Sequence, residues 1–246
     1  WSYAKTQAQP SIAVSVSPEI PRGVAGEEID VTVEVQNTGS EPIYRLLATT
    51  DSEDVIFKGK ELIFGKIEPG EKKSWSTKFE VPKWALTRED LITLKFQDGN
   101  NSDIKDSSFI TRIEGLPRPL YSYSYEVVDD GRFGSEGNGN GIAELDETVV
   151  LSMKVKNIGA GISEKASMNL KNDSGETIFL ENGRDVIENL GTAETKDAHF
   201  MFKVVQPENL VDLELQFIDE VFRAGVISKL VIPIDKDDAG YKDNKY

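Results

Sequence analysis

An internal repeat constrains this chain more than any other feature of its sequence. Residues 28–35 carry β-branched side chains at every second position, and residues 148–155 alternate in the same phase. The first segment runs into Asn37 and Gly39, and the second runs into Asn157 and Gly159, 120 positions later (157 − 37). Alternation with a period of two predicts half-buried strands, and the constant offset predicts two copies of one domain.

Each copy continues as a series of short strands. Residues 55–57, 65–67 and 79–81 correspond to residues 177–179, 188–190 and 202–204. Each copy then has a proline, at Pro82 or Pro207, and another alternating stretch, at residues 91–96 or 213–217. Glycine, asparagine and proline mark the turns, and no long stretch has the helical period. The pattern predicts an all-β fold made of two tandem immunoglobulin-like antiparallel β-sandwiches.

A short segment rich in proline separates the two copies. Gly115, Pro117 and Pro119 are poorly suited to a strand ladder, so they predict a short, stiff linker. We therefore expect a sandwich without a metal over residues 1–114, and a second sandwich, with an acidic loop rich in asparagine and glycine, over residues 115–235. Residues 236–246 have almost nothing to bury and predict a polar tail.

The composition argues against catalysis and against several classes of partner. The chain has 43 acidic and 28 basic residues, a formal net charge of −15, so it repels nucleic-acid phosphates. The absence of cysteine excludes thiol catalysis, cysteine-bound zinc, iron–sulfur clusters and disulfides. No apolar run reaches the roughly 18–20 residues of a membrane-spanning helix. We expect that this chain alone is not an enzyme, binds no nucleic acid and does not insert into a membrane.

His199 is the single histidine and hence the only candidate for histidine chemistry. Phe200, Phe202 and Val204 alternate to one face of its segment, so the pattern predicts His199 on the solvent-facing side. A catalytic histidine needs a cleft and an orienting partner, and this segment indicates neither. The sequence also has no Gly-x-Ser-x-Gly nucleophile elbow.

One acidic loop, between the first two strands of the second copy, carries a metal-binding pattern. Counted from Glu136 as position 1, the spacing matches an EF-hand-type calcium loop. The predicted oxygen ligands are Glu136, Asn138, Asn140, the backbone carbonyl of Ile142, Glu144 and Glu147, with Asp129 or Asp130 able to contribute from the end of the preceding strand. Ca²⁺ takes about 6–8 oxygen ligands, and glycines let the chain curl around it.

The same loop has a second interpretation. Asn-Gly pairs also occur in tight turns simply because they adopt positive φ, so the loop could be a glycine-rich hairpin without a metal. However, the four carboxylates at Glu136, Glu144, Asp146 and Glu147 repel one another unless something neutralises them. This charge count favours a structural Ca²⁺ as the cofactor of the second domain.

Residues 138–149 followed by 155–161 resemble the start of the second strand in bacterial immunoglobulin-like modules of the cell-adhesion-related type. There a short acidic Asn-Gly loop leads into a Gly-Glu-Thr-Val turn, at which this chain has Asp146 in place of the glycine. The first copy carries a shorter version at residues 26–28 and 37–39, with a Pro-Gly-Glu turn at residues 69–71. The resemblance implies an immunoglobulin-like fold and an extracytoplasmic location, that is, periplasmic, secreted or at the cell surface.

The tandem order, with a Gly-Arg-Asp turn at residues 183–185, also resembles the non-catalytic C-terminal region of secreted or periplasmic carboxy-terminal processing serine proteases that contain a PDZ domain. This resemblance implies a non-catalytic structural or interaction module, serving as spacer, adaptor or substrate-positioning arm of a larger protein. Its partners would be other domains of that protein or a separate protein partner.

A carbohydrate-binding module or an adhesin-type surface stalk is the alternative function. Tyr121, Tyr123 and Tyr125 alternate onto one face of a predicted strand, where exposed rings could stack on a glycan. Such tyrosines also commonly pack over a sheet edge or against a neighbouring domain. A glycan therefore stays a possible partner on the sequence alone.

Overall fold

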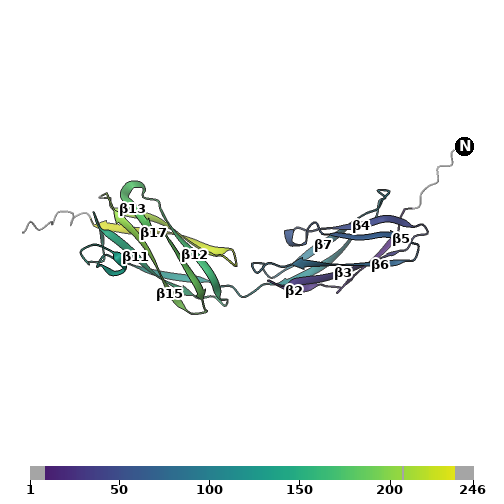
Figure 1. The fold of residues 1–246 in the computed structure, drawn as a ribbon, viewed down its shortest axis with the longest axis horizontal. Coiled ribbons are helices and arrows are strands. Elements are labelled where there is room, and N and C mark those ends of the chain that lie inside the picture. Colours follow the sequence, from purple (N-terminus) through teal and green to yellow (C-terminus); the bar gives the residue numbers. More distant parts are fainter. Residues whose placement is uncertain (1–8, 207, 236–246) are drawn as a thin grey trace, which may run out of the picture. The chain divides into compact units, whose positions relative to one another are not determined.

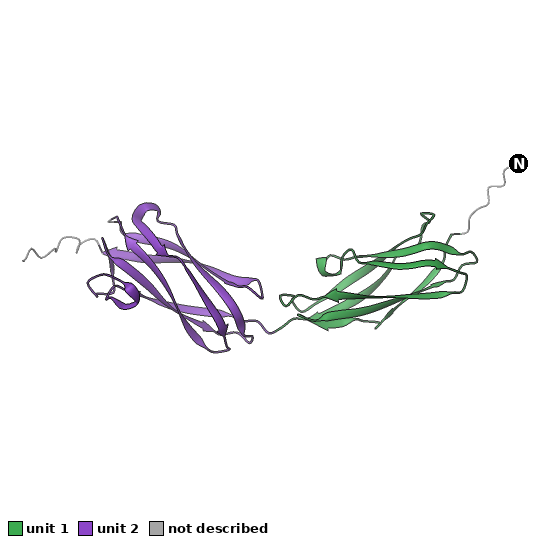
Figure 2. Cartoon of the chain, viewed as in Figure 1, with its two compact units in different colours: residues 1–116 green, residues 117–246 purple. Residues whose placement is uncertain are grey.

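The computed structural model describes residues 9–206 and 208–235. The chain divides into two compact units, residues 1–116 and 117–246, which we call unit 1 and unit 2 (Figure 2). Within the described residues the secondary structure consists of strands and three short 3₁₀ turns, with no α-helix (Figure 1). The polar tail predicted over residues 236–246 lies outside the described residues.

Unit 1 is a sandwich of a three-stranded and a five-stranded sheet. Its elements are β1 (Ile12–Ser17), β2 (Arg22–Val24), β3 (Glu28–Asn37), β4 (Ile43–Asp51), η1 (Val55–Phe57), β5 (Glu61–Ile67), β6 (Lys72–Glu80), β7 (Arg88–Gln97) and β8 (Ser107–Glu114). The sheets have the strand orders β1-β3-β6 and β2-β8-β7-β4-β5. All neighbouring strands are antiparallel except the short β2, which pairs parallel with β8.

Unit 2 repeats this arrangement with one additional strand. Its elements are β9 (Tyr121–Val128), η2 (Arg132–Gly134), β10 (Ala143–Glu144), β11 (Thr148–Asn157), β12 (Ser163–Asn172), η3 (Gly175–Thr177), β13 (Ile178–Asn182), β14 (Arg184–Leu190), β15 (Thr195–Val204), β16 (Leu210–Asp219) and β17 (Ala224–Asp235). The strand orders are β13-β15-β11-β9 and β10-β17-β16-β12-β14. The predicted all-β fold of two tandem sandwiches is confirmed. β13 occupies the sheet edge next to β15, where unit 1 has only the turn η1.

The two strands that revealed the repeat, β3 and β11, lie in the middle of their sheets. Their alternate side chains point into the cores, and the eight of them are almost wholly buried: Ile29, Val31, Val33, Val35, Val149, Leu151, Met153 and Val155. The preceding turn is also shared, because Gly26 and Asp146 both adopt positive φ (92° and 69°). Asp146 therefore keeps in the second copy the left-handed turn that Gly26 makes in the first.

The asparagine that ends each of these strands is a buried clamp between the two sheets. In unit 1, Asn37 Nδ2 donates to the carbonyls of Glu41 (2.8 Å) and Ile67 (3.1 Å). In unit 2, Asn157 Nδ2 donates to the carbonyls of Gly161 (2.8 Å) and Leu190 (3.3 Å). Each Oδ1 accepts the N–H of the glycine two residues later. The repeated Asn-x-Gly thus has a structural reason: the asparagine side chain supplies a buried hydrogen-bond partner to two carbonyls and to the glycine N–H.

A buried aspartate also lies at the end of two equivalent strands: Asp98 directly follows β7, and Asp219 is the last residue of β16. Asp98 in unit 1 accepts hydrogen bonds from its own turn, namely from the N–H of Asn100 and from the N–H and hydroxyl of Ser102. Its counterpart Asp219 is fully buried and accepts from Tyr121 Oη and Ser163 Oγ, each at 2.7 Å. The Asp219 network therefore joins β9 of one sheet to β12 and β16 of the other. Burial raises the pKa of the Tyr121 phenol well above its usual range.

Each unit begins and finishes at opposite ends of its own central strand. In unit 1, Ile12 of β1 pairs with Asn37 at the end of β3, while the carbonyl of Glu114 accepts from Ala25 N near the start of β3. In unit 2, Tyr121 pairs with Asn157, and β17 finishes beside β10, just before β11 starts. Both central strands have ten residues, so each unit separates its incoming and outgoing segments by about 33 Å.

Candidate cation-binding loop

The acidic loop, residues 129–142, folds back over the outer face of the sheet that contains β11. The first six residues of β11 are buried on both faces, and the outward-facing Val150 is only 1% exposed. The corresponding residue of unit 1, Asp30, is exposed. Glu136 forms an isolated bridge to Thr148, with N–H···O distances of 2.8 and 2.9 Å in the two directions. The sequence indicates that this face is covered, because unit 2 has Thr148 and Val150 at the outward positions where unit 1 has the charged Glu28 and Asp30.

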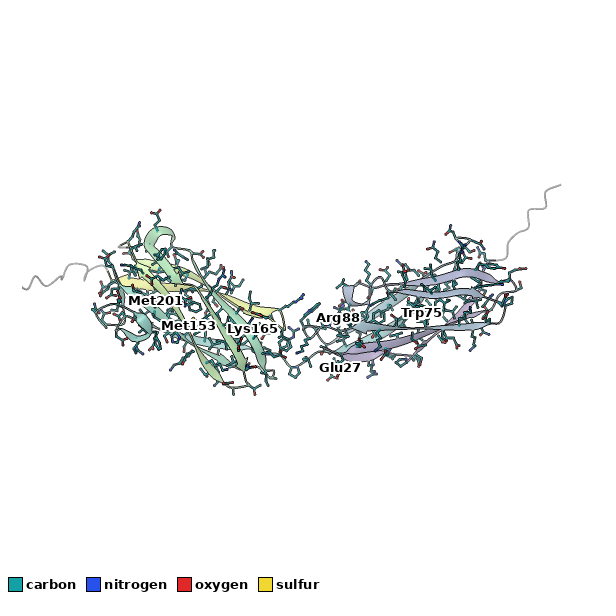
Figure 3. The ribbon with its side chains drawn as sticks, viewed as in Figure 1. Glu27, Trp75, Arg88, Met153, Lys165 and Met201 are labelled. Atoms are coloured by element: carbon teal, nitrogen blue, oxygen red, sulfur yellow. The ribbon has the colours of Figure 1, made fainter. Side chains whose placement is uncertain are left out.

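The turn η2 provides an aromatic contact between this loop and the sheet. The Phe133 ring lies 4.1 Å from the His199 ring, centroid to centroid, and Phe133 itself has a left-handed backbone (φ 58°). Met201, labelled in Figure 3, extends toward Gly134 on the same face. His199 is therefore on the outward face of β15, but it is partly covered rather than open to solvent. Its Nε2 is buried and has no hydrogen-bond partner among the described residues.

Asp129 organises the tip of the loop. Its carboxylate, on a residue only 2% exposed, accepts three backbone N–H groups: Oδ2 from Gly139 (3.1 Å) and Asn140 (3.0 Å), and Oδ1 from Gly141 (3.0 Å). Positive φ at Gly139 and Gly141 aims these groups at one point. Asp129 was predicted only as an additional ligand, but it is the centre around which the loop is wound.

Glu144 and Glu147 bring two further carboxylates to the same loop. Glu144, 7% exposed, accepts from the side-chain amides of Asn138 (2.6 Å) and Asn140 (2.9 Å). Glu147 accepts from the backbone N–H groups of Asn138 (3.0 Å) and Glu144 (3.2 Å). Gly137 lies between the acids, since a Cβ there would stand 2.7 Å from Glu147 Oε1 and 2.8 Å from Asp129 Cβ.

The three carboxylates have no basic side chain as an ion-pair partner within the described part of the chain. Arg132, the nearest cation along the sequence, pairs instead with Asp130 (2.9 Å) and Glu126 (3.2 Å). Burial raises the pKa of the Glu147 carboxyl, and the negative charges of Glu144 and Asp129 raise it further, against the lowering effect of its N–H donors. The loop therefore concentrates negative charge in a partly desolvated place.

The predicted ligands divide into two groups in the structure. Asp129, Glu144, Glu147, Asn138 and Asn140 lie together, joined by the hydrogen bonds described above. Asp130 is turned to Arg132, and Glu136 is exposed on the segment that bridges Thr148. Ile142 donates its N–H to Asn140 Oδ1 (2.8 Å). As the side chains stand, no group of three or more His, Asp or Glu among the described residues is arranged to hold a metal ion. A cation here would require the two asparagine amides to turn their oxygens toward the carboxylates.

The tyrosines of β9 are mostly used for packing. Tyr121 and Tyr123 pack against the core of unit 2, and the Tyr121 ring lies 4.1 Å from that of Phe217. Tyr125 is 40% exposed. Tyr121 and Tyr123 are therefore packing residues rather than an exposed face on which a glycan could stack.

Each unit is an immunoglobulin-like β-sandwich, as the strand order of its two sheets defines. No family model matches the chain, and no curated protein is similar to it. A helix with the length and hydropathy to cross a membrane does not occur among the described residues.

Solved structures similar to the whole chain have low identities. A Porphyromonas gingivalis W83 protein of unknown function is 11% identical over 89% of this chain and 99% of its own, with a TM-score of 0.29. The fibronectin(III)-like modules of Clostridium thermocellum CbhA are 12% identical over 91% and 94%, with a TM-score of 0.29. Red sea bream transglutaminase is 12% identical over 92% of this chain and 31% of its own, with a TM-score of 0.31.

Proposed function

We propose that the chain is a non-catalytic structural module, a spacer or positioning arm of a larger extracytoplasmic protein. The observation that supports this is the position of the incoming and outgoing segments at opposite ends of each unit. A sandwich whose two segments left from the same end would add a side branch. A sandwich that passes the chain from end to end adds its own length between its neighbours.

Paired spin labels test the spacer property within unit 1. The chain has no cysteine, so Ser40→Cys and Glu27→Cys, at exposed positions near opposite ends of β3, give a unique label pair. We expect a single narrow distance distribution centred at about 30–40 Å by double electron–electron resonance. A control pair, Ser40→Cys with Glu68→Cys, places both labels at the same end and should give a much shorter distance. A broad distribution, or equal distances for the two pairs, would contradict the proposal.

The larger protein is proposed on sequence resemblance alone. The tandem order and residues 183–185 support an accessory region of a carboxy-terminal processing serine protease, in which the two units would hold substrate or partner at a set distance from the catalytic domain. A PDZ domain and a Ser/Lys protease domain encoded upstream in the same gene would favour this role. A run of further sandwich repeats upstream would favour the surface-stalk alternative instead.

We also propose that Ca²⁺ stabilises unit 2 by binding the acidic loop. The support is the concentration of Asp129, Glu144 and Glu147 in one loop without a basic partner among the described residues; binding would also need the two asparagine amides to turn, as described above. An ion that binds the folded state at about 100 times its dissociation constant adds about 2.7 kcal/mol to stability. It would offset the carboxylate repulsion and fix the loop that covers Val150.

Calorimetric scans with Ca²⁺ and with chelator test this proposal. We expect Ca²⁺ to raise the melting temperature of unit 2 by about 10 °C and to leave unit 1 unchanged. Glu144→Gln, which keeps the side chain's size but removes a charge, should abolish most of the shift. An unchanged melting temperature, or an equal shift in Glu144→Gln, would overturn it.

The same proposal has a pH dependence that follows from Glu147. Because the folded-state pKa of Glu147 is raised, ionised Glu147 weakens the ion-free unit at neutral pH, and this loss disappears as protons bind on lowering the pH. Protons and Ca²⁺ then compete for one carboxylate, so the Ca²⁺-induced shift should shrink as the pH falls toward about 5. A shift of constant size between neutral pH and pH 5 would argue against Glu147 as a ligand.

A further inference from the structure

Unit 1 has a cavity of about 640 Å³ at the end where β4 finishes and β7 starts. Its lining includes Ser52, Glu53, Lys58, Arg88, Asp90 and Leu91. Arg88 is labelled in Figure 3. The volume is within the range of about 300–1,000 Å³ that small-ligand pockets have. We call this cavity the Asp90 pocket.

Asp90 occupies a position that faces the core. It alternates with the buried Ile92, Leu94 and Phe96 on β7, and its own side chain is only 3% exposed. Phe96 pairs with Ala48 as Phe217 pairs with Met168, so Asp90 corresponds to Val211, which is fully buried in unit 2. One copy of the repeat therefore has a carboxylate where the other has a packed apolar side chain. A buried charge at such a position reduces stability unless it is paired, and Arg88 pairs with only one of the two carboxylate oxygens of Asp90.

Two polar atoms that line the Asp90 pocket have no partner. Asp90 Oδ1 accepts from the Arg88 guanidinium, but Oδ2 is buried without a hydrogen bond, and so is Ser52 Oγ, among the described residues. In unit 2 the residue at the position of Ser52 is Asn172, whose amide donates to the carbonyls of Gly175 and Ile178. An unpaired buried polar atom reduces stability by about 1–3 kcal/mol, and a bound group that hydrogen-bonds to these two atoms would remove that cost.

The charges around the pocket define what that group must be. Both cations are already paired, Arg88 with Asp54 (2.7 Å) and Asp90, and Lys58 with Asp51 (3.6 Å). Glu53 at the rim forms no ion pair with any described residue. The groups left over are thus the carboxylates of Asp90 and Glu53, which only accept hydrogen bonds, and the Ser52 hydroxyl, which can accept or donate. An occupant that suits both carboxylates donates hydrogen bonds and carries positive charge.

The pocket also offers apolar surface beside these acceptors. Leu91 points outward from β7, on the face opposite to Asp90, is 59% exposed and also lines the cavity. A straight aliphatic chain can lie on such a surface while its charged end reaches the carboxylates. We propose that the Asp90 pocket binds a primary ammonium group on an aliphatic stem, the chemistry of a lysine side chain in a partner segment. The net charge of −15 favours such a cationic partner. This site does not depend on the spacer proposal.

Titration of the whole chain with a short peptide tests the Asp90 pocket. The probe is acetyl-Gly-Lys-Gly-amide, followed by ¹H–¹⁵N NMR, and the comparison peptide carries an acetylated lysine ammonium. We expect shifts at Ser52, Asp90 and Leu91 with a dissociation constant of about 1 mM, and none with the acetylated peptide. Equal binding of both peptides, or no shifts at about 10 mM of the lysine peptide, would overturn the proposal.

Variants show whether the Asp90 pocket itself is responsible. Asp90→Val reproduces the residue of unit 2, so it should fold at least as stably as the parent and weaken binding more than tenfold. Ser52→Ala should weaken it several-fold. Asp103→Asn, a change at an exposed aspartate outside the pocket lining, removes the same charge and should leave the affinity nearly unchanged. Unchanged affinity in Asp90→Val, or an equal loss in Asp103→Asn, would contradict the assignment. The spin-label distances report on the spacer separately.

Discussion

Asp219→Ala is expected to destabilise unit 2 by about 3–5 kcal/mol, more than the loss of any one hydrogen bond would. The carboxylate accepts four hydrogen bonds, from Tyr121 Oη, Ser163 Oγ and the N–H groups of Val221 (3.0 Å) and Phe222 (2.8 Å). Alanine would leave a buried hydroxyl and a phenol without their acceptor and would remove the only polar connection described between β9 and β16.

Differential scanning calorimetry measures this effect. For a sandwich of this size the loss corresponds to a fall of about 12–20 °C in the melting temperature of unit 2. Asp98→Ala is the matched control, because Asp98 forms hydrogen bonds only within its own turn. This substitution should lower the melting temperature of unit 1 by a smaller amount. Tyr121→Phe removes one of the four donors and should lower the free energy of unfolding of unit 2 by about 1 kcal/mol. If Asp219→Ala lowered the melting temperature no more than Asp98→Ala, the role of Asp219 in joining the sheets would be wrong.

Asn157→Ala and Asn37→Ala are expected to destabilise unit 2 and unit 1, respectively, by about 3–4 kcal/mol each. Each asparagine is fully buried and bonds two carbonyls through Nδ2 and a glycine N–H through Oδ1. Alanine cannot make these hydrogen bonds. On the buried side, water cannot reach the carbonyls to replace them.

Urea denaturation of each variant, followed separately for the two units, checks the matched pair. The repeat provides its own control, since each change should affect one unit and spare the other. Gln36→Ala, next to Asn37 but only half-buried, should change stability by less than about 1 kcal/mol. Equal losses in both units after one substitution would mean that the units do not unfold independently. A loss below about 1 kcal/mol would mean that water replaces the clamp.

The fold was predictable because its main signal is local. Period-two alternation depends on which face of a strand is buried, and the duplicated Asn-x-Gly fixes where the strand ends. The parallel pairs were not predictable, since β2 and β10 have only three and two residues and find their partners 90 or more positions along the chain. Asp98 and Asp219 were also missed, because an aspartate after a strand is equally typical of an exposed turn.

The candidate sites were predictable only in part. The sequence indicates an acidic loop rich in glycine, but the choice of Asp129, Glu144 and Glu147 over Asp130 and Glu136 depends on how positive-φ glycines direct the backbone. The outward-facing residues of β11 were informative as well as the inward-facing ones. An apolar outward side chain such as Val150 indicates that another segment covers that face of the sheet. Asp90 illustrates the same point, since comparison with Val211 of the second copy marks it as unusual, and only the pairing register makes that comparison possible.

The parallel pairing of β2 with β8 and of β10 with β17 has a mechanical consequence. In a hairpin pulled at its two ends, hydrogen bonds open one after another. In a parallel pair whose strands are drawn in opposite directions along their length, the bonds lie across the force and must shear together. Pulling apart the segments on either side of a unit applies shear to these pairs, so resistance to stretching is set by the unfolding rate under tension rather than by equilibrium stability. With three residue pairs against two, unit 1 would have the longer shear contact.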